Sequence, residues 1–298
     1  MTSKDLVTIR VVSYNAEDTV LDTLESIKNQ TYDNLELVFS DDCSQDNTVK
    51  IAKSWIESNY ARFYRVQLLT VEKNTGICEN LNRALKASTG KWIKGIAADD
   101  ILLPNCISDF MLFVKEHPLA QFICSLQKEY KNTFEESNYI RTTGQMYDNI
   151  MDKSAVEQLQ TIAYNNPIVA SSVFCSKYLL EELGGYDNRF GYEDHPLYIT
   201  MLEHGFRIYY MPIETTGYRV HESTMHTVGK LFNPKFIPLS ARFRKERCFK
   251  YYTVRQKLSL KLRWSFMSFV DKCGLNKATK INSFLFNKIM ALFVLIGR

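Results

Sequence analysis

Two adjacent carboxylates, Asp99 and Asp100, directly follow residues 92–97, an apolar segment typical of a buried strand. Such a pair is costly at the end of a buried strand unless a cation neutralises it. A hard divalent ion such as Mg²⁺ or Mn²⁺ prefers oxygen ligands and commonly bridges carboxylates to a diphosphate. Taken alone, the pair is better explained as a solvated turn that caps the next helix. Its role therefore depends on what surrounds it.

Polar residues also follow two other predicted strands. Ser13, Tyr14 and Asn15 come after residues 7–12, and Asp42 comes shortly after residues 35–39. In open α/β sheets, ligands bind beyond the carboxyl ends of the strands. Asp42 is then placed to contact a base or ribose, and Tyr14 to lie against a nucleobase, although singly each is more often a turn or packing residue. Three strands together predict a site at one sheet edge.

The second half of the chain offers a candidate base and a further candidate ligand. Glu193 and Asp194 begin a predicted helix, where a carboxylate could act as general base on an acceptor hydroxyl or complement the helix dipole. His221 follows a short predicted strand and could supply a nitrogen ligand to the same ion, although a lone histidine is more often a surface or core residue.

The elements that must position these residues alternate between strands and helices. This rhythm predicts an α/β fold with a mostly parallel central sheet covered by helices. The predicted strands are residues 7–12, 35–39, 66–71, 92–97 and 208–211, with helical patterns between them and over residues 179–183 and 191–205. Residues 168–174 form a further ordered segment, whereas residues 127–153 are polar, irregular and without a predicted element.

Composition sets outer limits on the class of protein. The 298 residues are 45% hydrophobic and 23% charged, which is typical of a globular chain. The seven cysteines form no C-x-x-C pair, which argues against a disulfide framework or a structural zinc site and favours a reducing cytosol. The N-terminus has no apolar run of signal-peptide length.

Charge divides the chain unevenly. Residues 231–298 hold 15 Lys and Arg against 2 Asp and Glu, a net charge of +13, whereas residues 1–230 hold 22 against 31, a net charge of −9. Aromatic and aliphatic residues alternate with the basic ones in this C-terminal segment. It fits either an amphipathic extension on a membrane surface or a packing helix with a solvated basic face.

Several short motifs, in this order and spacing, resemble those of family 2 glycosyltransferases of the GT-A fold. The resemblance runs from about residue 7 to about residue 226. It rests on the segments V-S-Y-N (12–15), S-I-K-N-Q-T-Y (26–32), D-D-C-S-Q-D-N-T (41–48), N-T-G with Asn82 (74–82), A-D-D (98–100), L-G-G-Y-D (183–187), Y-E-D (192–194) and Y-R-V-H (218–221). The chain departs from the family pattern at Ser13, where Pro is usual, at Leu81, where Arg is frequent, and at Ala98, where the first Asp of a D-x-D motif is expected.

The resemblance implies an inverting transfer of a sugar from a nucleotide-sugar, with UDP-linked donors as the default. It implies that Asp194 is the catalytic base, that Asp100 and His221 bind Mn²⁺ or Mg²⁺, and that Asp99 reaches the ribose or bridges to the metal through water. The residues implied on the donor side are Ser13, Tyr14, Asn15, Glu17, Asp42, Asn74, Asn82 and Asp99, and those on the acceptor side are Gly185, Tyr186, Asp187 and Glu193.

These patterns predict a GT-A domain over residues 1–230, with a nucleotide-sugar-binding half at 1–125 and an acceptor half at 126–230, followed by a basic helical extension at 231–298. The expected acceptor is a glycan or lipid-linked oligosaccharide in surface-polysaccharide assembly. The expected location is cytoplasmic, on the inner face of the cell membrane, with peripheral membrane contact through 231–298 and no nucleic-acid partner.

Two alternatives remain open from the sequence. A sugar nucleotidyltransferase would be expected to carry a glycine-rich basic loop near its N-terminus, and residues 15–22 are acidic and contain no glycine. A non-catalytic protein that binds membrane or nucleic acid through the basic extension would show binding with a steep salt dependence.

Overall fold

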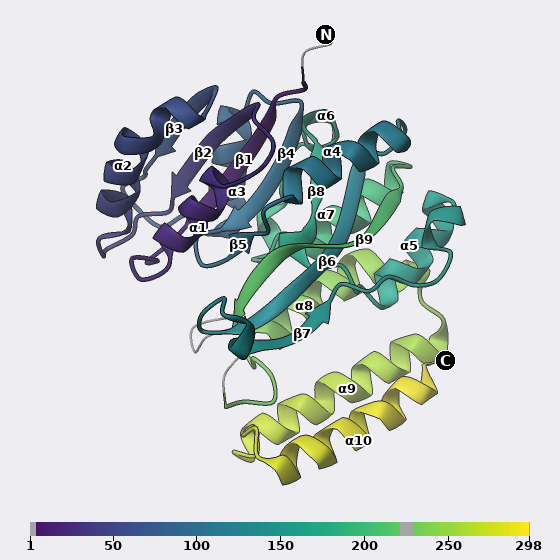
Figure 1. Ribbon diagram of the computed structural model, residues 1–298. Helices are drawn as coiled ribbons and strands as arrows, with labels where there is room; N and C mark the ends of the chain where they lie inside the picture. Colours follow the sequence, from purple (N-terminus) through teal and green to yellow (C-terminus); the bar gives the residue numbers. More distant parts are fainter. Residues whose placement is uncertain (1–3, 221–228, 298) are drawn as a thin grey trace. The chain divides into compact units, whose positions relative to one another are not determined.

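The computed structural model describes residues 4–220 and 229–297. The chain divides into two compact units, which are described separately. The first comprises Met1–Gln158 and Pro167–Arg219, and the second comprises Leu159–Asn166 and Val220–Arg298. Figure 1 shows the course of the chain and the element labels.

Among the described residues, nine strands form one sheet in the order β3-β2-β1-β4-β8-β6-β9-β5, with β7 paired to β6. The predicted α/β fold with a parallel centre is confirmed, since β1 lies parallel to β2 and β4, and β2 lies parallel to β3. Later strands join this centre in antiparallel pairs. The strands are β1 Val7–Ser13, β2 Leu35–Asp41, β3 Arg65–Leu69, β4 Trp92–Ala97, β5 Ile101–Leu102, β6 Phe122–Lys131, β7 Tyr139–Thr143, β8 Phe174–Ser176 and β9 Ile208–Val220.

Helices connect the strands and cover the sheet (Figure 1). They are α1 Val20–Lys28, α2 Thr48–Asn59, α3 Ile77–Ala87, α4 Cys106–Glu116, α5 Ala155–Tyr164, α6 Lys177–Glu182 and α7 Asp194–Glu203. Successive side chains of β1 point to opposite faces of the sheet, so this strand contacts helices on both faces. Ile9 and Val11 join the main apolar cluster with α1, α2 and α4, whereas Arg10 reaches the backbone of α3.

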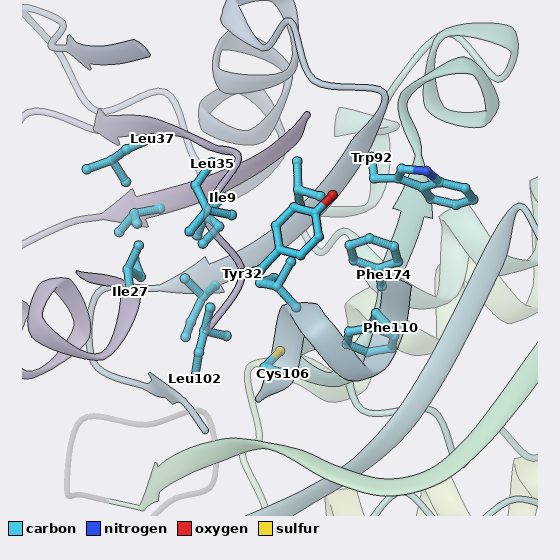
Figure 2. Close-up of a cluster of buried hydrophobic side chains, with 14 of the residues drawn as sticks. Ile9, Ile27, Tyr32, Leu35, Leu37, Trp92, Leu102, Cys106, Phe110 and Phe174 are labelled. Atoms are coloured by element: carbon cyan, nitrogen blue, oxygen red, sulfur yellow. The ribbon is translucent and has the colours of Figure 1, made fainter. Parts of the chain in front are cut away.

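A stack of three aromatic rings fixes the antiparallel part of the sheet to the parallel part. The ring of Phe174 on β8 lies 5.3 Å from that of Trp92 on β4 and 4.7 Å from that of Phe110 on α4, with interplanar angles of 10° and 8°. Figure 2 shows this stack beside the aliphatic cluster. Because buried aromatic side chains contribute large apolar areas, the stack holds β4, and therefore Asp99 and Asp100 beyond it, against α4.

The structure corrects two expectations from the sequence. Residues 127–153 contain the end of β6 and the whole of β7, which pair as a hairpin, followed by a 3₁₀ turn at Ile150–Asp152. β7 is mostly exposed, so it carries no apolar pattern. The short strand predicted at 208–211 is the start of β9, which is 13 residues long in all; its later part is mostly polar and pairs with β5 at Thr216 and Gly217. Both were missed because pairing, rather than hydrophobicity, defines them.

The second unit is helical. It contains α8 Phe236–Phe243, a π-helical turn at Arg244–Cys248, a 3₁₀ turn at Phe249–Tyr251, α9 Val254–Lys272 and α10 Lys280–Ile296. A capping box begins α9, since Thr253 Oγ1 accepts from Gln256 N at 3.2 Å and Gln256 Oε1 accepts from Thr253 N at 3.0 Å. The predicted helical C-terminal region is thus confirmed, whereas the predicted domain boundary at residue 230 stays a prediction. No helix in the described ranges is long and apolar enough to cross a membrane.

Candidate nucleotide-sugar site

The ends of β1 and β2 are joined by side-chain hydrogen bonds. Asp41 accepts from Ser13 Oγ at 2.7 Å, from Ser44 N at 2.7 Å and from Ser44 Oγ at 2.5 Å. Asn15, in the left-handed conformation with φ of 50°, donates its N–H to Ser44 Oγ at 2.8 Å and accepts from Gln45 N at 2.8 Å. The loops after the two strands are therefore held as one surface at the carboxyl edge of the sheet.

Two predicted donor-side residues lie on this surface. Tyr14 follows Ser13 with 52% of its surface exposed, so its ring is open to a ligand. Glu17 accepts from Asn47 N and Nδ2, both at 2.9 Å, and so ties the segment after β1 to the start of α2.

Asp42 organises the loop before α3. Its carboxylate accepts from Thr75 Oγ1 at 2.6 Å, from Gly76 N at 2.7 Å and from Arg83 Nη2 at 3.2 Å. Burial alone would raise the pKa of Asp42, but these hydrogen bonds outweigh burial and hold the pKa below its usual value. Asp42 is thus a charged anchor at the predicted position. Asn74 lies in the same loop and accepts from Gly76 N at 3.2 Å.

Arg83 contacts the Asp42 anchor, and the sequence prediction gave it no role. Its guanidinium donates to Ser40 Oγ at 3.0 Å, to Asn80 Oδ1 at 2.8 Å and to Asp42. It therefore places a cation at the edge where a diphosphate is expected, although Leu81 occupies the position at which the family often has Arg. The signal was available, because Asn80 and Arg83 are three residues apart and share one face of α3.

Asp100 is a buried carboxylate at the end of β4. It is 2% exposed, and its Oδ1 accepts from Arg219 N at 2.9 Å. Burial raises the pKa of Asp100 well above its usual value, and the neighbouring charge of Asp99 raises it further. A buried anion of this kind is stabilised by a nearby cation. Lys94 is fully buried on β4, three residues before the strand ends at Ala97, and its charge partly opposes the rise in the pKa of Asp100.

Arg219 holds the Asp99–Asp100 turn in place. Its Nε donates to the carbonyl oxygen of Asp99 at 2.9 Å, its Nη2 donates to Asp22 at 2.6 Å, and its guanidinium lies 4.4 Å from the centre of the Phe134 ring. One buried arginine on β9 therefore connects α1, the end of β4 and the loop after β6. The Y-R-V-H segment carried this residue, but the sequence prediction gave it no role.

Asp99 and Asp100 fit a divalent cation by chemistry, because their oxygens are the donors that Mg²⁺ and Mn²⁺ prefer and Asp100 needs neutralising charge. Within residues 4–220 and 229–297, no group of three or more His, Cys, Asp and Glu side chains is placed to hold a metal. The third predicted ligand, His221, lies outside the described residues. Metal binding through Asp100 stays a prediction.

The predicted acceptor-side glycine loop is fastened to α3 by Asn82. The side chain of Asn82 accepts from Tyr186 N at 2.8 Å and donates to Tyr186 O at 2.9 Å. A Cβ at Gly185 would lie 2.4 Å from Asn82 Oδ1, and Gly185 has φ of 83°, so this position requires glycine. The structure therefore places Asn82 against the acceptor loop and not at the Asp42 anchor.

Arg10, on the central strand β1, supports the same loop. It is 3% exposed, and its Nη2 donates to Tyr186 Oη at 2.6 Å while its carbon Cζ lies 5.0 Å from the Tyr186 ring centre. Its Nε has no hydrogen-bond partner within the described part of the chain. A charged residue in the otherwise apolar strand 7–12 was the sequence signal for this contact.

Tyr186→Phe removes one of the few partners of this buried guanidinium. We expect the free energy of unfolding to fall by about 1–3 kcal/mol, since a buried charged donor loses its acceptor. Equilibrium urea unfolding measures the change. Tyr178→Phe is the matched control, because Tyr178 is 60% exposed, and a change of less than about 0.5 kcal/mol is expected there. Equal effects in the two variants would contradict the role given to the Arg10–Tyr186 bond.

Asp187 and the pair Glu193–Asp194 follow the glycine loop. Asp187 is engaged by Arg189 Nη2 at 2.6 Å. Asp194 is the first residue of α7, and its Oδ1 accepts from His195 N at 2.6 Å. Burial raises the pKa of Glu193 to about 7, and the charge of Asp194 adds to the rise. Glu193 therefore holds a proton at mildly acidic pH.

Cys78 shows that the two sides of the site meet at the first turn of α3. Burial raises the pKa of its thiol to about 12, and the charges of Glu193, Asp187, Glu79 and Asp194 contribute to that rise. Gly76, two residues before Cys78, donates its backbone N–H to the Asp42 carboxylate. The Asp42 anchor therefore binds the backbone just before α3, and the charges of Glu193 and Asp194 act on the first turn of the same helix.

The fold has a parallel sheet with polar strand ends, a carboxylate-anchored loop before a helix, and a buried Asp100 beside a half-buried Asp99, which is typical of an α/β protein that binds a nucleotide-linked ligand. Residues 8–178 match the family described as Glycosyl transferase family 2. The chain belongs to this family and is a nucleotide-sugar glycosyltransferase, which decides between the alternatives left open by the sequence.

Two relatives in bacteria agree with this assignment. The Escherichia coli protein named UDP-Glc:alpha-D-GlcNAc-diphosphoundecaprenol beta-1,3-glucosyltransferase WfaP is 26% identical over 224 residues, which are 74% of this chain and 80% of the relative. The Bacillus subtilis (strain 168) protein named putative glycosyltransferase EpsE is 26% identical over 235 residues, which are 75% of this chain and 76% of the relative.

Solved structures confirm the GT-A-like fold. S. aureus TarS 1-349 in complex with UDP-GlcNAc superposes with a TM-score of 0.62 at 16% identity, over 98% of this chain and 82% of that one. The mannosyltransferase PcManGT from Pyrobaculum calidifontis, in complex with GDP-Man and Mn2+, superposes with a TM-score of 0.58 at 17% identity, over 99% of this chain and 86% of that one.

Proposed function

We propose that the chain transfers a sugar, with inversion, from a UDP-linked donor to a lipid-linked or glycan acceptor in bacterial polysaccharide synthesis. The observation that carries the proposal is that Asp42 and the Asp99–Asp100 turn follow β2 and β4, which both lie parallel to β1, so these carboxylates stand at the same edge of the sheet. Asp194, the proposed base, begins α7. Support for the UDP donor and the lipid-diphosphate acceptor comes from the name of the Escherichia coli relative.

In the proposed reaction, Asp194 takes the proton from the acceptor hydroxyl. The hydroxyl oxygen forms the new bond to the anomeric carbon as the bond from that carbon to the diphosphate oxygen breaks, and the nucleoside diphosphate leaves with the electron pair. A single displacement of this kind needs one base. Asp194 carries out this step, while Asn82 and Arg10 hold the Gly185–Tyr186 loop that precedes it.

The donor is held, on this proposal, by the surface that Ser13, Asp41 and Asp42 organise, with Tyr14 against the base and Arg83 near the diphosphate. Asp100, with Asp99 and His221, would hold Mn²⁺ or Mg²⁺. When bound, such an ion stabilises the charge that develops on a departing diphosphate. Support for Mn²⁺ is the presence of that ion in the structurally similar mannosyltransferase complex.

A transfer assay tests the proposal. The full chain is incubated with UDP-glucose, UDP-N-acetylglucosamine or GDP-mannose and with a synthetic lipid-diphosphate N-acetylglucosamine acceptor. The reactions contain Mn²⁺, Mg²⁺ or excess EDTA. We expect product only from a UDP-linked donor, and only with a divalent ion. Transfer from GDP-mannose alone would contradict the donor assignment, and equal rates in EDTA would contradict the metal requirement.

A further inference from the structure

Helix α10 carries an apolar stripe on the face that its own unit leaves exposed. Ile281 is 72% exposed, Leu285 is 53% exposed and Leu292 is 60% exposed. These positions recur at the spacing that keeps residues on one side of a helix. We call this set the outer stripe of α10, and its members are Ile281, Phe284, Leu285, Leu292 and Leu295. It therefore runs the whole length of the helix.

The opposite side of α10 packs on α9. The ring of Phe266 lies 5.6 Å from that of Phe286 and 5.8 Å from that of Phe293, and Ser259 Oγ donates to Phe293 O at 2.6 Å. Figure 1 shows the two helices side by side within the second unit. Because the packing side is already apolar, the outer stripe makes α10 apolar nearly all round. A helix of this kind is normally covered on both sides.

Charge indicates what covers the outer stripe. Residues 272–298 contain five Lys and Arg and no Asp or Glu. Lys277, Lys280 and Lys288 are exposed, and Lys288 lies within the stripe, 5.6 Å from the Phe284 ring centre. Lysines can reach an anionic layer while their stems lie on apolar surface. The partner that packs on the outer stripe therefore has to be apolar inside and anionic at its boundary.

An anionic lipid surface meets both conditions, and a second copy of the chain does not. Pairing two outer stripes would bring two Lys288 side chains and two segments of net charge +13 together. The 17 residues of α10 are about 26 Å long at 1.5 Å per residue, which suits a helix lying in the plane of the interface. We propose that the second unit docks on an anionic membrane surface through the outer stripe of α10, with the surrounding lysines at the headgroups.

Vesicle sedimentation with the full chain tests the proposal. We expect binding to phosphatidylcholine vesicles that contain phosphatidylglycerol to exceed binding to pure phosphatidylcholine vesicles by about tenfold or more, and to weaken as salt rises. The double variant Leu285→Glu, Leu292→Glu should lower binding by at least about tenfold, because it places two carboxylates in the apolar layer.

The matched control is Leu112→Glu, Leu119→Glu in the first unit. These leucines are 60% and 81% exposed, are also seven residues apart and receive the same added charge. Binding close to that of the unchanged chain is expected. Equal loss in both double variants would overturn the proposal, because net charge alone would then explain the effect.

The triple variant Lys277→Gln, Lys280→Gln, Lys288→Gln separates the two contributions. It should lose the preference for anionic vesicles.

Sedimentation equilibrium is run on the unchanged chain and on the Leu285→Glu, Leu292→Glu variant. A concentration-dependent oligomer that only the variant loses, with no vesicle binding by the unchanged chain, would show that a second copy covers the stripe and would overturn the proposal. Release of UDP from the donor, measured in each variant, distinguishes loss of docking from loss of the proposed sugar transfer.

Discussion

Asp194→Asn should lower kcat for sugar transfer by about 10²–10⁴-fold, because a positioned general base contributes a factor of this size. The amide keeps an oxygen that can accept from His195 N at the start of α7, so the helix should begin unchanged. Binding of UDP should stay within about twofold of the unchanged chain, since the Asp42 anchor lies on other elements. A continuous assay of UDP release and calorimetric titration with UDP measure the two quantities.

Glu193 is the residue that could replace Asp194 as base, and its variant provides the control. Burial and, in second place, the charge of Asp194 raise the pKa of Glu193 to about 7, so Asp194→Asn should lower that pKa and increase the ionised fraction of Glu193 at neutral pH. Glu193→Gln should keep most of the transfer activity. If Glu193→Gln abolished transfer while Asp194→Asn retained more than about a tenth of it, the roles given to the two carboxyls would have to be exchanged.

The centre of the parallel part of the fold could be predicted because β1 and β2 are buried on both faces and β4 is largely so. The apolar runs at 7–12, 35–39 and 92–97 match β1, β2 and β4 within two residues at their ends. β7 and most of β9 could not be found in this way. β7 is exposed, and the sequence of β9 from Pro212 to Gly217 is polar, so register with a neighbouring strand decides these elements.

Within the candidate site, the carboxylates were predictable and the arginines were not. Asp42, Asp100 and Asp194 stand at strand and helix ends that sequence periodicity locates. Arg83 and Arg219 are long side chains whose contacts come from distant segments, and Arg219 alone joins residues 22, 99 and 132. Asn82 shows the converse limit. Its motif was recognised, but its amide binds the backbone of Tyr186, more than 100 residues away in sequence.

Asp100→Asn should reduce kcat/KM for transfer by about 10²–10³-fold. This range follows if the metal contributes several kcal/mol and each 1.4 kcal/mol corresponds to a factor of ten. The neutral amide can still accept from Arg219 N, so the turn after β4 should persist. The loss should appear both in kcat and in the affinity for UDP measured with Mn²⁺, whereas UDP affinity measured in EDTA should change little.

Asp100→Asn should lower activity, but in the absence of metal it should not lower the free energy of unfolding. Burial and Asp99 raise the pKa of Asp100, so its ionisation costs stability, and the folded state becomes less stable as pH rises through that raised pKa. Asn carries no charge, and Asp100→Asn in EDTA should therefore be as stable as the unchanged chain or more stable at pH 8, with the difference shrinking toward pH 4. Thermal unfolding across this pH range measures the effect.

Mn²⁺ should raise the Tm of the unchanged chain but not that of the variant, and an equal rise in both would exclude Asp100 as the metal ligand. The Asp99→Asn variant completes the comparison, since it removes only the neighbouring charge and should retain part of the Mn²⁺ effect.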